Sequence, residues 1–138
     1  MTKNPLMRRF IWTHLILSLG YVASVALASW FIPDDAEPSL TVIIFAAFPG
    51  VMVVGWIWNM GRLYLTMEDE FLRMLEVRKA MWATAIALGI CGGWGLIELF
   101  ASVPRLPVFF VVPIWCLGLI AGHLINRFTH GTGGGSLW

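Results

Sequence analysis

The sequence predicts an all-α fold, a four-helix transmembrane bundle that has both termini in the cytoplasm and a third helix extended into the cytoplasm. Three observations predict it. Of 138 residues, 59% are hydrophobic and 12% are charged, which is too little polar surface to coat a soluble globule. Four apolar runs are long enough to cross a bilayer. Lysine and arginine gather almost entirely on one side of these runs.

The four apolar runs define the membrane domain. About 20 apolar residues, at ~1.5 Å per residue, cross a hydrocarbon core of ~30 Å. We place the spans near residues 10–32, 40–60, 80–101 and 108–126, within a single domain over residues 1–127. Basic residues precede the first run, as in a signal peptide, but the run exceeds the ~7–15 apolar residues of a signal core. We therefore expect an uncleaved first helix and a multi-pass protein in contact with lipid.

The basic residues predict the orientation. They lie before the first run, between the second and third, and after the fourth: Lys3, Arg8, Arg9, Arg62, Arg73, Arg78, Lys79 and Arg127. Only Arg105 falls on the opposite side, where Asp34, Asp35 and Glu37 also lie. The positive-inside rule therefore places both termini and the middle connection in the cytoplasm. A net charge of +1, without a basic soluble face, argues against direct nucleic-acid binding.

Small residues predict close packing between helices. They recur at four-residue intervals in three of the runs: Gly20, Ser24 and Ala28; Ala85, Gly89 and Gly93; Gly118 and Gly122. Because lipid removes the hydrophobic drive for association, helices in a bilayer rely on close backbone approach at such stripes. We expect them to join neighbouring helices, and they also permit a homo-oligomer. Pro49-Gly50 is expected to kink the second helix.

The connection between the second and third runs predicts a cytoplasmic helix over residues 67–79. Thr66, followed three residues later by Asp69, resembles a capping box, and acidic residues precede basic ones as the helix dipole favours. Asp69 and Arg73 have the spacing of an i,i+4 ion pair. No helix breaker occurs between Met67 and Ala101, so we expect one helix to rise from the cytoplasm and continue as the third span.

An apolar stripe on this cytoplasmic helix supplies the functional hypothesis. The stripe comprises Met67, Phe71, Met74 and Leu75. It can lie on the membrane surface, pack on an extension of the second helix, or bind a cytosolic protein. Mixed acidic and apolar residues anchor poorly to anionic lipid, so the hypothesis is a non-enzymatic partner-binding protein. Its candidate residues are Met67, Glu68, Asp69, Glu70, Phe71, Arg73, Met74, Leu75 and Arg78.

Polar residues within the expected spans leave two alternatives open. Glu98 is acidic and intramembrane, which suggests a small transporter, although pairing with Arg105 or hydration at the interface explains it structurally. His14 and His123 lie at similar depths and could ligate haem, or serve a quinone-linked redox protein. Interhelical hydrogen bonds, or placement at the membrane interface, are the structural explanations for both histidines. We predict no metal site and no cofactor, with haem as the alternative.

The two cysteines and the end of the chain complete the predictions. Cys91 and Cys116 form no C-x-x-C pair, and we expect them to be small apolar packing residues. The end of the chain, residues 128–138, is rich in glycine, and we expect a flexible tail without a function of its own.

The segment Met67-Glu68-Asp69-Glu70-Phe71-Leu72-Arg73 resembles a signature of the form M-x-D-E-[FM]-x-R. That signature marks a family of small, largely uncharacterised four-span proteins of the bacterial inner membrane. The resemblance continues through Trp94-Gly95, Glu98 and residues 103–107. It implies a location in the bacterial inner membrane and, through neighbouring small helix-turn-helix regulators, a cytosolic protein partner. It implies no catalytic residues.

Overall fold

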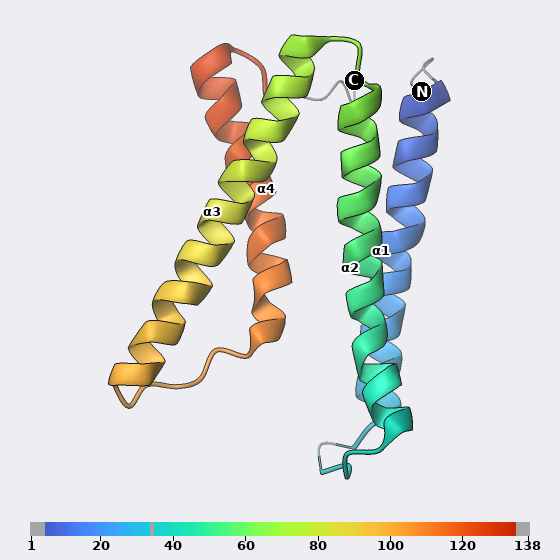
Figure 1. Ribbon diagram of the computed structural model, residues 1–138, viewed down its shortest axis with the longest axis vertical. Helices are drawn as coiled ribbons and strands as arrows, with labels where there is room; N and C mark the ends of the chain where they lie inside the picture. The colour runs from blue at the N-terminus through green and yellow to red at the C-terminus, as the bar shows by residue number, and fades with distance from the viewer. Residues whose placement is uncertain (1–4, 34, 135–138) are drawn as a thin grey trace. The chain divides into compact units, whose positions relative to one another are not determined.

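The computed structural model describes residues 5–33 and 35–134, and helices account for most of them (Figure 1). The α-helices are α1 (Pro5–Phe31), α2 (Leu40–Thr66), α3 (Glu70–Phe100) and α4 (Val111–His130). A short 3-10 turn, η1 (Val108–Phe110), leads into α4. No strand occurs in the described part of the chain. The all-α prediction is confirmed.

Each of the four expected membrane spans overlaps one of these helices, and the helices extend beyond the expected bounds, most of all at the start of α3. Each is long and apolar enough to cross a bilayer, over Met7–Phe31, Leu40–Thr66, Glu70–Phe100 and Val108–His130. Large apolar side chains are exposed along all four, for example Ile16, Val54, Leu96 and Leu117. Exposed apolar surface on this scale requires lipid or protein cover. The chain is therefore a multi-pass membrane protein.

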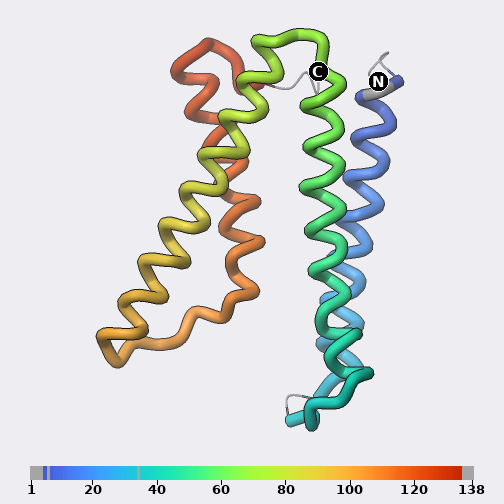
Figure 2. The backbone as a smooth tube through the Cα atoms, viewed as in Figure 1, coloured from blue at the N-terminus to red at the C-terminus, as the bar shows by residue number. Residues whose placement is uncertain are grey.

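The chain divides into two compact units that meet at the Thr66–Met67 junction. In the first unit, α1 and α2 run antiparallel as a helical hairpin, and in the second, α3 and α4 do the same (Figure 2). Within the second hairpin, the helices touch near the start of α3 and diverge toward its end (Figure 1). Each connection is short, which favours antiparallel neighbours.

The first hairpin packs through small residues, one of them predicted (Gly20) and one that the sequence analysis did not single out (Gly55). A Cβ added at Gly20 would lie 3.2 Å from the Met52 sulfur, and one at Gly55 would lie 2.9 Å from Leu17 Cδ2. Ser24 is buried and donates its hydroxyl to the Tyr21 carbonyl at 2.8 Å. The stripe that begins at Gly20 therefore faces α2, as expected. α2 continues as one helix through Pro49.

The second hairpin packs backbone against backbone. A Cβ at Gly118 would lie 2.7 Å from Ala83 Cα, and one at Gly122 would lie 2.7 Å from the Lys79 carbonyl oxygen. The α4 stripe is thus a packing surface, as predicted. Its counterpart on α3 follows the four-residue spacing of Lys79, Ala83 and Ala87, and both alanines are buried.

The expected small-residue stripe of α3 does not face α4. Ala85, Gly89 and Gly93 are exposed, and a Cβ added at either glycine would meet nothing within 4 Å. The physical reason is rotational. Ala85 follows Ala83 by two residues, which places it roughly 200° around the helix. α3 therefore has two small-residue faces, and its sequence does not distinguish the one that α4 covers.

Replacing Gly118 with alanine should destabilise the second hairpin, because the new methyl group must push against the α3 backbone. We expect the Gly118→Ala variant to lose ~1–3 kcal/mol of unfolding free energy, measured by denaturation in mixed micelles. The matched control is Gly89→Ala, which gains the same helix propensity in open space and should not lose stability. Equal stability of the two variants would contradict the packing described above.

Candidate functional site

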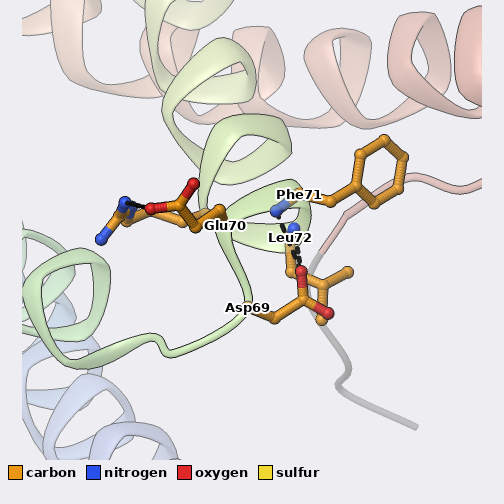
Figure 3. A network of polar contacts seen from close by, with 5 residues as sticks. Asp69, Glu70, Phe71 and Leu72 are labelled. Atoms are coloured by element: carbon orange, nitrogen blue, oxygen red, sulfur yellow. Dashed lines mark hydrogen bonds and ion pairs between the residues drawn. The ribbon is translucent and has the colours of Figure 1, made fainter.

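Asp69 starts α3. Its Oδ1 accepts hydrogen bonds from the backbone N–H groups of Phe71 at 2.9 Å and Leu72 at 3.0 Å (Figure 3). A carboxylate at this position satisfies free N–H groups and also complements the positive end of the helix dipole. The helix therefore begins with an N-cap of the strongest kind.

The capping box expected from Thr66 and Asp69 is not formed. Thr66 is the last residue of α2, and its hydroxyl donates back to the carbonyls of Arg62 and Leu63 at 2.9 and 3.0 Å. A threonine near a helix end can bond its own preceding turn in this way. Asp69, three residues on, is then the cap itself and not the third residue of the helix.

The first ion pair of α3 also differs from the expected one. Arg73 pairs with Glu70 at 3.0 Å, an i,i+3 contact, whereas the sequence suggested Asp69. Asp69 caps the backbone N–H groups, and Glu70 is the acid that meets the guanidinium. Both side chains are solvent-exposed, 85% for Glu70 and 41% for Arg73, so the pair adds at most ~1 kcal/mol. Glu70 and Phe71 point to different sides of the helix (Figure 3).

α3 is longer than a bilayer core is thick. Its 31 residues span ~46 Å at ~1.5 Å per residue, against a hydrocarbon core of ~30 Å. A helix of this length either tilts within the bilayer or extends beyond the hydrocarbon at one end. Residues 70–79, which we call the α3 extension, carry all the basic residues of the helix and all but one of its acidic residues. The N-terminal end of α3 is therefore the part of the helix least suited to hydrocarbon.

The α3 extension has two faces. Leu75 is fully buried, and together with Lys79 it belongs to the side that packs on α4. On the opposite side, which we call the far face, lie Glu70, Met74 and Val77, and Met81 continues the same stripe just beyond the extension. Met74 is 45% exposed and Val77 is 39% exposed. The far face is therefore exposed, and it is apolar apart from Glu70 at its N-terminal end.

The structure divides the candidate partner-binding residues. Glu68, Asp69, Glu70, Phe71 and Met74 are exposed, and Met67, Arg73 and Arg78 are partly exposed. Leu75 is buried inside the hairpin and is removed from the candidate surface. Val77 and Met81 are added to the candidate surface, although sequence reasoning missed them. Their signal was available, because both fall on the stripe that runs from Met74 at helical spacing.

Phe71 and Arg78 lie at the edge of this surface and touch the end of α4. The Phe71 ring packs edge-on against the His130 ring, with centroids 6.1 Å apart. An Arg78 guanidinium nitrogen contacts His130 Nε2. These contacts tie the start of α3 to the last turn of α4. Phe71 is 47% exposed, so only part of its side chain is available to a partner.

A buried polar cluster lies beneath the extension, and sequence reasoning missed it. It comprises Glu76, Lys79 and Asn126, and Asn126 is fully inaccessible. Glu76 Oε2 pairs with Lys79 Nζ at 2.6 Å. Asn126 Nδ2 donates to the Leu75 carbonyl at 2.7 Å. The second oxygens, Glu76 Oε1 and Asn126 Oδ1, are buried and accept no hydrogen bond from the described residues.

The position of Asn126 offered a sequence signal for this cluster. Asn126 follows Gly118 and Gly122 at four-residue spacing, so it continues the stripe that packs on α3. A polar residue on a packing stripe must find a partner, because an unpaired buried amide costs about 1–3 kcal/mol. Leu75 supplies that partner through its backbone carbonyl.

Glu98 secures the connection between α3 and α4. Its Oε1 accepts a hydrogen bond from the Leu106 backbone N–H at 2.5 Å, and Trp94 Nε1 donates to the Pro104 carbonyl at 3.2 Å. Among the described residues, Glu98 makes no ion pair with Arg105, so the pairing suggested by the sequence is corrected. The turn after Pro104 brings a backbone N–H to the carboxylate and leaves the Arg105 side chain exposed.

The two candidate histidines belong to different units, and each has neighbours of its own. His14 lies between the Phe10 and Trp56 rings, with centroids 5.5 and 5.9 Å away. His123 lies against Gly133, at the end of α4. Within residues 5–33 and 35–134, no three His, Cys, Asp or Glu side chains are grouped to hold a metal ion. Cys91 and Cys116 are free thiols, both partly buried, in keeping with a packing role.

Comparison with known proteins adds no relative. No protein-family model matches the chain, and neither a curated protein nor a solved structure is significantly similar to it.

Glu98 should tolerate loss of its charge but not loss of its oxygen. In Glu98→Gln the amide oxygen still accepts from Leu106 N–H, so we expect the unfolding free energy to stay within ~0.5 kcal/mol of the parent. In Glu98→Ala the N–H loses its partner, and we expect a loss of ~1–3 kcal/mol. Denaturation in mixed micelles measures both. A large loss in the glutamine variant would show that the carboxylate charge itself is needed, as in an ion pair or a proton path.

Proposed function

We propose that this chain is a non-enzymatic protein of the bacterial inner membrane that holds a cytosolic protein partner on the far face of the α3 extension. The observation that carries the proposal is the exposure of Met74 and Val77 on a helical segment too charged to sit in hydrocarbon. Apolar side chains in that position are covered neither by lipid nor by α4. A protein surface is the cover that the chemistry favours.

The proposed orientation follows from the basic residues. The positive-inside rule assigns the α3 extension, with Arg73, Arg78 and Lys79, to the cytoplasmic side. Both chain ends then lie on that side as well. The four spans make the protein a fixed platform, and the extension projects from it into the cytosol. The partner is accordingly a cytosolic protein.

The acidic residues at the start of the α3 extension indicate the kind of partner. Glu68, Asp69 and Glu70 are consecutive and exposed, and they form an acidic tip where the extension and its far face begin. An acidic tip next to an apolar patch suits a small basic protein that has an apolar patch of its own, because opposite charges steer association and set its register. Small helix-turn-helix regulators have this character, since they carry basic residues for phosphate contacts. The resemblance noted at Met67–Arg73 points to the same class of partner.

Such a complex suggests a mechanism of regulation. Acidic side chains that cover the basic surface of a regulator would compete with the phosphates of DNA for it. Held at the membrane in this way, the regulator would be sequestered from its sites, and release would restore it. The membrane protein needs no catalytic group for this role, only a rigid, exposed and correctly charged helix.

The two alternatives draw no support from the described contacts. Glu98 is engaged by the backbone of its own connection, which accounts for an intramembrane carboxylate without a transport role. His14 and His123 each pack within their own hairpin, against Trp56 and Gly133 respectively.

Outside the second hairpin, the open Ala85–Gly89–Gly93 face remains available to another helix or to a second copy of the chain.

Photo-crosslinking in living cells tests the proposal. A photoreactive residue at Met74 or Val77 should form adducts with a cytosolic protein, whereas one at Leu96, exposed at the far end of α3, should not. Glu68→Lys should lower the yield of these adducts about tenfold, because it reverses one charge of the acidic tip.

Two results would contradict the proposal. Adducts that map only to the chain's own α2 would show that the far face packs inside the protein. The absence of any cytosolic adduct at either position would remove the partner.

A further inference from the structure

The chain turns back on itself after α4. Gly131 adopts a left-handed conformation (φ 76°), and its N–H bonds the Arg127 carbonyl at 3.0 Å. This is the glycine C-cap that ends many helices, and it redirects the following residues. Gly133 and Gly134 are then buried against the hairpin. The first part of the expected flexible tail is therefore a packed segment, and α4 itself includes residues 128–130.

The packed segment requires glycine at two consecutive positions. A Cβ at Gly133 would overlap the His123 ring. At Gly134 a Cβ would lie 2.9 Å from Leu75 Cβ and 3.3 Å from Glu76 Oε1, and the backbone is again left-handed (φ 80°). Both positions thus exclude side chains, one against an aromatic face and the other against α3. A bare main chain is what fits between them.

The floor under these glycines is polar. Asn126 Nδ2, which bonds the Leu75 carbonyl, also lies 3.5 Å from the Gly133 carbonyl oxygen. The buried acceptors Glu76 Oε1 and Asn126 Oδ1 accept nothing from the described residues. Within the described part of the chain, the one polar contact to the glycines is therefore the Asn126 amide directed at a carbonyl oxygen, a group that every polypeptide backbone carries.

We propose that Leu75, Glu76, His123 and Asn126 form a binding site for a glycine-glycine main chain, and that the chain's own Gly133–Gly134 occupies it. The site selects glycine, because a side chain at either position would collide with His123 or Leu75. The bound segment is a removable strap over the polar cluster. This inference does not rest on the proposed cytosolic partner, because the site, its occupant and its test lie within the second hairpin.

A buried thiol provides the test. In full-length protein with Cys91→Ala and Cys116→Ala, Leu75→Cys places a single thiol under the strap, and its labelling by a maleimide in detergent reports whether the strap is closed. Gly133→Leu should raise the labelling rate about tenfold by favouring the open state. Thr132→Ala, a change at the exposed neighbouring residue, should leave the rate unchanged. Gly133→Ala should also raise the rate, because its new methyl group meets the His123 ring. Adding His123→Ala to that variant should restore slow labelling, because it removes the ring.

A peptide added in solution separates a binding site from a merely buried residue. A synthetic peptide with the sequence of residues 131–138 should protect the thiol in the Gly133→Leu protein. The same peptide with leucine in place of Gly133 should not protect it. The proposal is overturned if the thiol reacts equally fast with the natural and the altered strap, or if the two peptides have the same effect.

Discussion

The contact between the α4 glycines and the α3 backbone fixes the rotation of α3, and the rest of the second hairpin depends on that rotation. Gly118 and Gly122 lie so close to Ala83 and Lys79 that no side chain can intervene. Once that face is chosen, every residue of the extension has its place, because a helix turns 100° per residue. Leu75 lies inside, and Met74, its neighbour in sequence, lies outside.

Hydropathy and helix signals sufficed to predict the helices and their number, since membrane spans are set by length and composition alone. The finer expectations failed where one residue had two possible partners. Thr66 bonds its own helix and leaves the cap to Asp69. Glu98 meets a backbone N–H in place of the Arg105 guanidinium, because the path of the connection decides which donor arrives. Three-dimensional proximity, which spacing along the chain does not encode, settles such choices.

The candidate surface was predictable in outline but not in membership. Helical spacing located an exposed, capped, charged segment, yet Leu75 and Met74 are indistinguishable by composition, and only the packing of α4 separates them. Glu76 shows the same limit for a charged residue that is buried. It is a charged residue in a charged segment, and its position toward α4 buries it beside Lys79 and Asn126. A buried ion pair of this kind needs the surrounding hydrogen bonds to offset its desolvation.

The rotation of α3 against α4 is therefore the central claim, and thiol scanning of residues 70–81 tests it most directly. Single cysteines introduced along this segment should label fastest at positions 70, 74, 77 and 81 and slowest at 72, 75, 76 and 79. A helix turned to place Ala85 and Gly89 against α4 would instead protect positions 74, 78 and 81. That second pattern, or a flat profile without helical periodicity, would contradict the account.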